Sequence, residues 1–234
     1  MSLHSKRSPS ACTRRVAAVW VSLFLVSAQA QPTGLLYDPE PPVDSGYVRV
    51  MMATDTPKVS VVVDNKVRVS SLEKNQVSDY MVMGAGMHQI AMVAAKKTVA
   101  SVPLDVARGS AVTVVFTSPD VAPQIFVDKT SNNKLKAMLS VYQLASKNET
   151  LDILTSDGTT KVFSSLAYGK LGALQVNPIS VALIATMSGA KTPLASTSLT
   201  MTQGGAYSVF LLPAKNDKIA AIQVQNKIER YTGK

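Results

Sequence analysis

The sequence is poor in the side chains on which most enzyme chemistry depends. Its single cysteine and single tryptophan, Cys12 and Trp20, both lie within the first 30 of its 234 residues, and it has only two histidines. Beyond residue 30, no thiol is available for a disulfide, a metal or a nucleophile. His88 is the one imidazole there, which argues against a zinc site built from several histidines and leaves a single candidate base.

Long apolar runs are also scarce. The apolar run Val16–Val26 is shorter than the roughly 20 residues that a membrane-spanning helix needs. Four basic residues precede it, and Ala28-Gln29-Ala30 follows it with small residues where signal peptidase requires them. This order predicts a secretory signal peptide over residues 1–30, cleaved before Gln31. We therefore expect the mature chain to reside in the periplasm.

The mature chain has only a mild excess of positive charge. Residues 1–30 carry four of the 24 lysines and arginines and none of the 15 acidic residues, so cleavage lowers the net charge from +9 to +5. No basic cluster with interleaved aromatic residues suggests nucleic-acid binding. Gly84-Ala-Gly86 lacks the lysine and the helix of a phosphate-binding loop. We expect no nucleic-acid partner, no cofactor and no metal, and a charge compatible with an anionic partner.

Helical periodicity is absent from residues 31–234, whereas short strand-like runs recur about every 8–12 residues, which predicts an all-β fold of sandwiches or barrels. Val, Ile, Thr and aromatic residues dominate these runs. Asp64-Asn65 and Asp157-Gly158 are typical hairpin turns. The strands predicted in the first half are Tyr47–Met52, Val59–Val63, Val67–Val69, Tyr80–Met83, Ile90–Ala95, Val99–Leu104 and Ala111–Phe116. Those predicted in the second half are Lys136–Tyr142, Thr150–Leu154, Thr160–Phe163, Ala173–Val176, Ile179–Ile184, Ala195–Met201 and Ala206–Leu212.

The second half of the chain also resembles the first in detail. This likeness favours two copies of one module, with a chance similarity between two all-β segments as the alternative. We predict two tandem β-sandwich domains after the cleaved signal peptide: an N-terminal sandwich with a Pro-rich arm at 31–122, a linker at 123–134 and a C-terminal sandwich at 135–234. The aligned pairs are Leu72 and Leu166, Ile90 and Val181, and Gly109 and Gly204, at offsets of 94, 91 and 95 residues.

Signals for catalysis are weak. His88 follows a glycine turn at the start of an apolar run, and no G-x-S-x-G motif accompanies it. We interpret it as an ordinary turn histidine and predict no catalytic residue and no enzymatic activity.

Binding residues are easier to nominate than catalytic ones. Lys96, Lys97, Arg108 and Lys170 lie at predicted loop ends and are candidate contacts for an anionic polysaccharide, with a merely solvated basic surface as the alternative. Tyr37 lies in the Pro-rich arm and is the candidate for contact with a protein partner. Prolines pre-order such an arm and so reduce the entropy lost on docking.

Three segments, in the same order along the chain, resemble the AlgF family of periplasmic alginate O-acetylation proteins. GLLYDPEPP at 34–42, followed by GYVRV at 46–50, is similar to that family's LYGP…FVRV opening. LDILTSDGTTK at 151–161 is similar to its LxLxTADGKT hairpin, and VNPISVAL at 176–183 to its INPVKVSLAL segment. The resemblance spans most of residues 31–212 and departs from the family over 64–82.

The resemblance implies a non-enzymatic periplasmic adaptor with two β-sandwich domains. Such an adaptor would link a membrane acyltransferase to SGNH-like periplasmic acetyltransferases, which pass acetyl groups to mannuronate hydroxyls. An anionic polysaccharide, alginate in the first place, is a further candidate partner. The departure over 64–82 leaves open whether the polymer is alginate or another acetylated polysaccharide.

Two other interpretations stay open. The chain could bind an anionic polysaccharide directly, as the cations suggest. It could also be a periplasmic chaperone or assembly protein, since tandem sandwiches also serve pilus assembly by adding a strand to an exposed edge.

Overall fold

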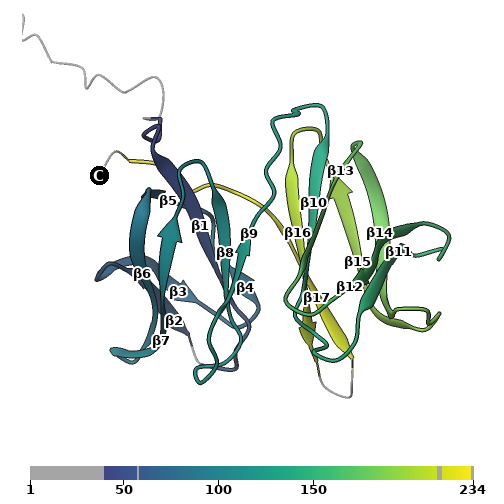
Figure 1. Ribbon diagram of the computed structural model, residues 1–234, viewed down its shortest axis with the longest axis horizontal. Coiled ribbons are helices and arrows are strands. Elements are labelled where there is room, and N and C mark those ends of the chain that lie inside the picture. Colours follow the sequence, from purple (N-terminus) through teal and green to yellow (C-terminus); the bar gives the residue numbers. More distant parts are fainter. Residues whose placement is uncertain (1–39, 57, 215–217, 233–234) are drawn as a thin grey trace, which may run out of the picture. The chain divides into compact units, whose positions relative to one another are not determined.

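The computed structural model describes residues 40–56, 58–214 and 218–232, which form seventeen β-strands and no helix (Figure 1). The prediction of an all-β chain is confirmed. In these ranges, accordingly, no helix is long and apolar enough to cross a bilayer. The predicted signal peptide at 1–30 and the candidate Tyr37 lie outside the described residues.

The first half of the described chain forms two sheets. In one sheet, β1 pairs with β4 and β5 along one edge and with β8 along the other, and β9 follows β8. The other sheet has the order β3-β2-β6-β7. The strands are β1 (Ser45–Met52), β2 (Val59–Val63), β3 (Lys66–Leu72), β4 (Gln76–Val77), β5 (Met81–Gly84), β6 (Gly86–Ala94), β7 (Lys97–Val106), β8 (Ala111–Phe116) and β9 (Gln124–Val127).

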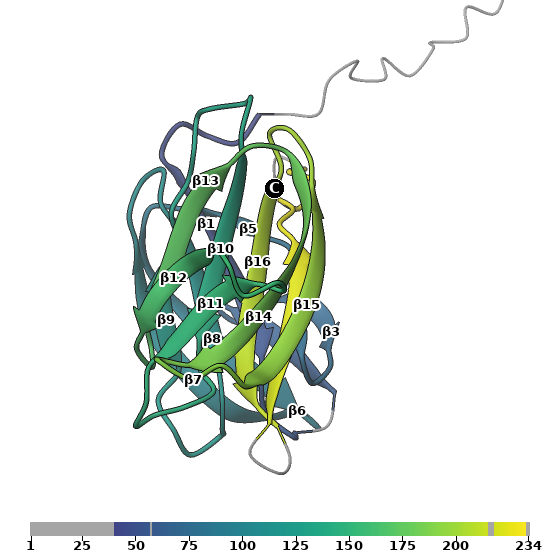
Figure 2. The same ribbon diagram turned by 90° about the vertical axis from the view of Figure 1, so that its right-hand side faces the viewer.

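The second half also forms two sheets, with the orders β13-β10-β16-β17 and β12-β11-β14-β15. The latter sheet faces the viewer in Figure 2. The strands are β10 (Ala137–Gln143), β11 (Leu151–Thr155), β12 (Lys161–Leu166), β13 (Leu171–Val176), β14 (Ile179–Met187), β15 (Pro193–Met201), β16 (Ala206–Pro213) and β17 (Ile219–Gln225).

Each pair of sheets encloses an apolar core, so each half is a β-sandwich. In the first sandwich, Val50 and Val114 from the central strands pack with Ile90 from the opposite sheet. In the second, Val141 and Leu183 take corresponding places. Side chains alternate between the two faces of a strand, so only every second residue of β1, β8, β10 and β16 enters these cores.

The other face of those four central strands is buried as well. Every residue of β8 and of β10 is buried. Here β1 pairs with β8, and β10 with β16, in parallel, and parallel strands covered on both faces read as continuous apolar runs. A third apolar cluster joins the two sandwiches through these faces. It consists of Met51, Val115, Phe126, Tyr142, Leu144, Phe210 and Leu212.

The two sandwiches share one topology. In the first sandwich β2 pairs with β3 and with β6. In the second, β11 pairs in the same way with β12 and with β14. The predicted alignment of Leu72 with Leu166 is confirmed, because both pair with the first residue of the neighbouring strand. The alignment of Ile90 with Val181 is wrong by two residues, since Leu183 takes the place of Ile90 in the pairing. A shift of two residues keeps every side chain on its face, so alternation could not reveal it.

Three strands escaped prediction: β4, β9 and β17. The strand β9 lies within 123–134, the stretch predicted to be a linker, where it pairs with β8 and buries Phe126. Its four residues follow a proline and precede a polar stretch, so the sequence shows no apolar run long enough to predict a strand there. The strand β17 is rich in alanine, which has little strand propensity.

The two predicted hairpin turns differ in their backbone. Asp64 and Asn65 both have positive φ, 48° and 66°, as a two-residue turn between twisted strands requires. At Asp157-Gly158 only Gly158 has positive φ, 72°. The hairpin there has a longer loop, closed by a hydrogen bond from Thr155 N to Thr160 O (2.9 Å), so one left-handed residue is enough.

The chain after β17 returns to the first sandwich (Figure 1). Ile228 forms a parallel bridge with Tyr80, and Tyr80 N donates to Lys227 O at 2.8 Å. Glu229 pairs with Arg68, and its carboxylate accepts a hydrogen bond from Val82 N. The C-terminal segment therefore ties the end of the second sandwich to the first.

Candidate functional site

The surface shared by the two sandwiches is layered along its central strands. At one end lie the aromatic and aliphatic residues of the third cluster, where the rings of Tyr142 and Phe210 stack 4.3 Å apart. Two residues further along each strand the facing side chains become polar: Arg49 and Thr113 from the first sandwich, and Ser208 from the second. Two residues beyond these, β8 and β16 carry the small Ala111 and Ala206, beside Tyr47 of β1 and Met138 of β10, and the space between the strands opens.

Arg49 is the centre of the polar layer. It is 1% exposed, and its guanidinium carbon lies 4.5 Å from the centroid of the Tyr80 ring. Its Nε donates to Thr113 Oγ1 at 2.9 Å. Its Nη atoms donate to side chains of the second sandwich, namely Asn226 at 2.8 Å, Tyr142 at 2.9 Å and Ser208 at 2.8 Å.

Asp128 supplies the negative charge of this layer without touching Arg49 in an ion pair. Its two carboxylate oxygens accept hydrogen bonds from Tyr80 (2.7 Å), Thr113 (2.6 Å) and Tyr142 (2.6 Å). Thr113 and Tyr142 also accept hydrogen bonds from Arg49, so each of these hydroxyl groups links the Arg49 cation to the Asp128 carboxylate. A buried network in which every member is satisfied favours one fixed geometry.

The two phenols of this network are held in their protonated form. Burial raises the pKa of Tyr142 to about 12, against the opposing effect of the nearby Arg49 cation. Burial raises the pKa of Tyr80 as well. Neither hydroxyl is therefore an activated nucleophile at neutral pH, and both serve as donors to Asp128.

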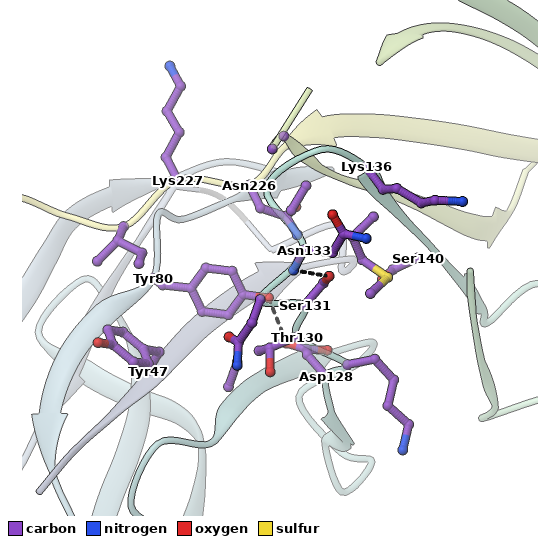
Figure 3. Close-up of a pocket in the computed structure, with 18 of the residues that line it drawn as sticks. Tyr47, Tyr80, Asp128, Thr130, Ser131, Asn133, Lys136, Ser140, Asn226 and Lys227 are labelled. Carbon is purple, nitrogen blue, oxygen red and sulfur yellow. Dashed lines mark hydrogen bonds between the residues drawn. The ribbon is translucent and has the colours of Figure 1, made fainter. Parts of the chain in front are cut away.

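A cavity of about 380 Å³ opens above the polar layer (Figure 3). It exists because the facing strands are lined here by Ala111 and Ala206, with Gly109 and Gly204 in the loops before them. Those two glycines have φ of 68° and 71°, a backbone conformation that other residues rarely adopt. The volume lies in the range of roughly 300–1,000 Å³ typical of ligand sites.

Three lysines, Lys129, Lys136 and Lys227, belong to the lining of the cavity. Lys136 and Lys227 project from different sides of its rim in Figure 3. Within the described ranges none of the three forms an ion pair, and Asp128 is the only acidic residue of the lining. Three lysines against this one carboxylate give the lining of the cavity a net positive charge.

Ser140 lies between the polar layer and the cavity. It is 2% exposed and lines the cavity, so a small polar side chain stands at the cavity wall. Among the described residues, the buried side-chain oxygen that lacks a hydrogen-bond partner is instead Thr186 Oγ1, on β14.

His88 is engaged elsewhere, in the first sandwich. Its two ring nitrogens lie 2.6 Å from Asp64 Oδ2 and 2.8 Å from Gly84 O, both of which are acceptors. Burial opposes protonation, but these two hydrogen bonds raise the pKa of the imidazole. Asp64 also accepts from Gln89 N, and that bond, followed by the one to His88, lowers the pKa of its carboxyl group. The ring lies on β6, and both of its nitrogens are occupied by these acceptors, which supports the prediction that His88 is not catalytic.

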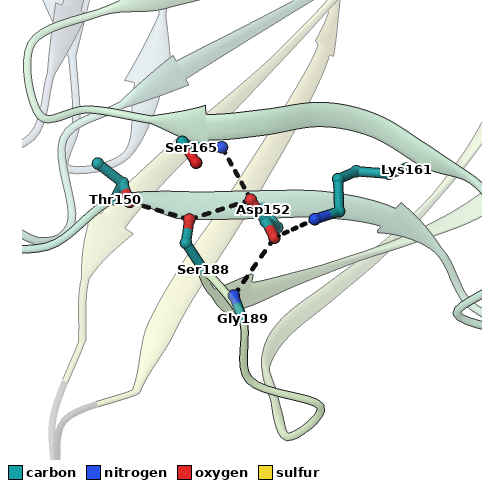
Figure 4. Close-up of polar contacts among 6 residues, drawn as sticks. All are labelled: Thr150, Asp152, Lys161, Ser165, Ser188 and Gly189. Carbon is teal, nitrogen blue, oxygen red and sulfur yellow. Dashed lines mark hydrogen bonds and ion pairs between the residues drawn. The ribbon is translucent and has the colours of Figure 1, made fainter.

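Asp152 is a second buried carboxylate, and it accepts hydrogen bonds from two backbone N–H groups and two side chains (Figure 4). It accepts hydrogen bonds from Lys161 Nζ at 2.7 Å, Ser165 N at 2.8 Å and Ser188 Oγ at 3.0 Å. The bond from Lys161, then that from Ser165, holds its pKa at about 2. Across the described part of the chain, no three His, Cys, Asp or Glu residues come together as a metal site would require.

Comparison with known proteins identifies the family. A family model described as alginate O-acetyl transferase AlgF matches residues 18–208. The chain belongs to the AlgF family. The alginate biosynthesis protein AlgF of Pseudomonas putida is 30% identical over 166 residues, which cover 71% of this chain and 73% of that protein. The resemblance noticed in the sequence is thereby confirmed.

Two solved structures are also similar to this AlgF-family chain. The C-terminal domain of AlgF from P. aeruginosa matches 40% of this chain and 100% of its own, with 24% identity and a TM-score of 0.34. The TIE protein of Bacillus anthracis matches 72% of this chain and 34% of its own, with 9% identity and a TM-score of 0.26.

The structure does not gather the cations that the sequence nominated in this AlgF-family chain. Lys96 and Lys97 lie at one end of β7 and Arg108 lies beyond the other, and a strand of ten residues spans roughly 30 Å. Lys170 precedes β13 in the second sandwich. All four side chains are exposed, and none of them lines the cavity. As binding residues they stay predictions.

Sequence reasoning missed both Arg49 and the lysines of the cavity. A signal for Arg49 was present, because it is the one charged residue in the apolar run YVRVMM at 47–52. The lysines had a weaker signal: Asp128-Lys129 follows β9 as Asn226-Lys227 follows β17. Since neither strand was predicted, that correspondence between the halves of this AlgF-family chain was hidden.

Proposed function

We propose that the chain is a non-catalytic component of alginate O-acetylation, an adaptor that links a membrane acyltransferase to a periplasmic SGNH-like acetyltransferase. Membership of the AlgF family supports the pathway, since its members bear names of alginate biosynthesis and O-acetylation. The predicted leader at 1–30 supports a periplasmic location.

One observation carries the non-catalytic part of the proposal: the only imidazole of the mature chain is held by two acceptors. Covalent acetyl transfer needs a nucleophile with a base beside it. With Asp64 and Gly84 on its two nitrogens, His88 is not free to take a proton from a hydroxyl. The mature chain also has no thiol.

The buried hydroxyl groups do not supply such a pair either. Ser208 accepts from Arg49 and donates to Asn226, so its neighbours are a cation and an amide, neither of which is a base. Tyr80 and Tyr142 stay protonated, as their raised pKa values indicate. This network is suited to fixing two sandwiches against each other, which is what an adaptor with two binding surfaces requires.

The proposal is tested in the organism by deleting the gene and measuring acetate per uronate in the polymer. We expect the deletion to remove O-acetyl groups and the wild-type gene to restore them. A His88→Asn variant should restore them as well, because imidazole takes no part in the chemistry. Unchanged acetate after deletion would exclude the pathway, and a folded His88→Asn protein that fails to restore acetylation would exclude the non-catalytic role.

The adaptor role has its own test, which is co-purification. The tagged chain should retain the SGNH-like acetyltransferase and the membrane acyltransferase, and loss of either partner contradicts a linking role. A chain that begins at Ser45 lacks Tyr37 and the Pro-rich arm. If it still retains both partners, the prediction that Tyr37 contacts a partner is wrong.

A further inference from the structure

We propose that the free edge of β9, in the first sandwich, accepts an added β-strand from a partner protein, a segment that is apolar at its centre and acidic at its ends. The inference rests on the proposed function, because the donor of the strand is one of the two acetylation proteins that the adaptor links. It deepens that function by naming the surface that this partner occupies and the chemistry that it recognises.

The strand β9 is the last strand of its sheet, since it pairs with β8 on one side and with no described strand on the other. Asp128 N donates to Ala111 O at 2.8 Å, which shows which residues at this end face β8. Every second residue of an antiparallel strand bonds to its neighbour, so Ile125 and Val127 direct their N–H and C=O groups away from β8. No backbone group elsewhere in the described chain bonds to them. Such unpaired groups are a template for a further strand.

The side chains of the same two residues are apolar and exposed, Ile125 by 44% and Val127 by 69%. They lie opposite Val114 and Val112, whose side chains belong to the first core. Directly opposed residues share a face of the sheet, so Ile125 and Val127 continue the apolar face of that core beyond the cover of the opposite sheet. A strand added here would bury both side chains, provided that its own residues on this face are apolar.

The second sandwich has a different edge at the same place. By strand register, Gln223 and Gln225 of β17 are equivalent to Ile125 and Val127. Both are polar, and Thr197 Oγ1 of β15 donates to Gln223 Oε1 at 3.2 Å. The strand β15 lies against β17, whereas β7, its equivalent in the first sandwich, has no comparable contact with β9. One copy of the repeat therefore has a polar edge that its opposite sheet contacts, and the other has an apolar edge that its opposite sheet leaves open.

Four other edge strands carry residues that oppose strand addition. Proline cannot donate a main-chain hydrogen bond, and charged side chains disfavour burial of an edge. Pro103 lies in β7 and Pro193 in β15, while β3 carries Lys66 and Arg68, and β12 carries Lys161. The strand β9 has neither a proline nor a charge. The strand β13 is a second edge without them, and it provides a control below.

Cations lie at both ends of β9, which selects the chemistry of the partner. Lys129 follows the strand and is exposed. At the other end, a Cβ at Gly169 would lie 3.2 Å from Gln124 Oε1, so the loop that carries the exposed Lys170 passes beside the start of β9 (Figure 2). Within the described ranges neither lysine forms an ion pair, although Asp120, in the loop before β9, reduces the positive charge there. A strand with acidic residues at its ends complements these cations.

Binding of the purified chain to the SGNH-like acetyltransferase, and to the membrane acyltransferase in detergent, tests the proposal by biolayer interferometry. Val127→Lys places a charge on the apolar edge and should weaken binding of one of these proteins about tenfold or more, since burial of a valine contributes about that factor. Val67→Lys is the matched control, because Val67 is 62% exposed on the edge strand β3 of the same sandwich. It should change the affinity by less than about twofold.

A second variant tests the backbone separately from the side chain. Val127→Pro removes the outward N–H that an added strand would use, stays apolar, and leaves the pairing with β8 in place. The loss of one main-chain hydrogen bond should weaken binding roughly 3- to 10-fold. Gln175→Pro is its control on β13, where the N–H of Gln175 also points outward, since Gln143 N bonds to Lys170 O. Circular dichroism and thermal unfolding check that each variant is folded.

Crosslinking identifies the occupant directly. Residues 31–234 contain no cysteine, so Val127→Cys and Val67→Cys each provide a single thiol for a photo-crosslinker. With the binding partner present, Val127→Cys should crosslink to an apolar segment with acidic ends, identified by mass spectrometry, and Val67→Cys should not.

The possible failures of the two proposals are distinguishable. If Val127→Lys and Val127→Pro bind both proteins as the wild type does, or if Val67→Lys loses as much affinity, the edge proposal is wrong and the adaptor role stands. Crosslinks from Val127→Cys to a second copy of this chain would also overturn it, because the edge would then serve self-association. A wild-type chain that binds neither protein contradicts the adaptor role, and the edge proposal with it.

Discussion

The two sandwiches have the same strand pairing, yet the faces by which they meet carry different side chains. In the first, the hydroxyl of Thr113 donates to the Asp128 carboxylate at 2.6 Å. In the second, the hydroxyl of Ser208 donates to the Asn226 amide oxygen at 2.9 Å. The same strand arrangement thus carries a charged side chain at this place in the first sandwich and a neutral one in the second. By strand register the equivalent pairs are Arg49 and Ser140, Thr113 and Ser208, and Asp128 and Asn226.

The difference explains how the cavity arises. Arg49 fills the space on its side and reaches across to Asn226 and Ser208 of the other sandwich. A second arginine in place of Ser140 would bring two buried cations together, which is costly. The small serine avoids this and leaves room above it.

Removing the buried positive charge of Arg49 from the first sandwich should have the largest effect on stability. Arg49→Met leaves the Asp128 carboxylate buried without its cation and should lower the free energy of unfolding by about 3–5 kcal/mol. Ser140→Ala, at the equivalent position of the second sandwich, removes only a small uncharged hydroxyl and should change it by about 1 kcal/mol or less. Chemical denaturation of both variants measures the contrast. Equal losses in the two variants would mean that Arg49 has no special role.

The two sandwiches also differ at an irregularity that they share. In β2 and in β11 the pairing with the next strand shifts register after the first residue. The side chain there is Ser60 in the first sandwich, whose hydroxyl donates to Ser70 O at 2.9 Å, and Asp152 in the second. The carboxylate accepts from the backbone of Ser165, which has a positive φ of 48°. The second bulge is therefore stabilised by a charged group that titrates, and the first is not.

Lowering the pH should destabilise the bulge of the second sandwich and leave that of the first unchanged. A carboxyl group with a lowered pKa stabilises the fold above its unfolded pKa, and this contribution disappears as pH falls through its folded pKa. For Asp152 the window runs from about pH 4 down to about pH 2, and the contribution is about 2 kcal/mol. Asp152→Asn should remove most of this loss, leaving the smaller shares of Asp64 and Asp157, whose pKa values are also lowered.

Unfolding free energies measured from pH 6 to pH 2 test this prediction. Ser60→Ala, the matched change in the first sandwich, should cost about 1 kcal/mol or less, independently of pH. If Asp152→Asn has the same acid dependence as the wild type, the bulge of the second sandwich does not depend on the charge.

The sequence predicts the scaffold better than the site. Fourteen of the strands lie where runs such as AVTVVF at 111–116 and KAMLSVY at 136–142 suggested, because a strand needs only local propensity and an apolar pattern. The strands β9 and β17 were missed because their flanking proline and their alanines weaken that local signal.

The site depends on pairings between distant segments, which the sequence does not display. Arg49 meets Tyr142, Ser208 and Asn226 only because two sheets pack face to face. Exposed lysines such as Lys96 are conspicuous in a sequence, whereas the lysines of the cavity acquire meaning only from the strands before them. The repeat was the one long-range signal available, and it would have paired Lys129 with Lys227 had both strands been recognised.

The smallest expected effect concerns a titrating pair that only the first sandwich has. By strand register, His88 takes the place that Val181 has in the second. A raised histidine pKa stabilises the fold below the unfolded pKa of about 6.5, and this stabilisation is lost as pH rises through the folded pKa. Asp64→Asn removes the carboxylate that raises it, so the imidazole should titrate at lower pH than in the wild type. Since Asp64 is half exposed, the change in stability should stay below about 1 kcal/mol. The histidine ring signals followed by NMR across pH 5–9 measure the shift directly. An unchanged pKa would show that Gly84 O alone holds the proton, and the two sandwiches would then not differ in their response to mild alkali through this pair.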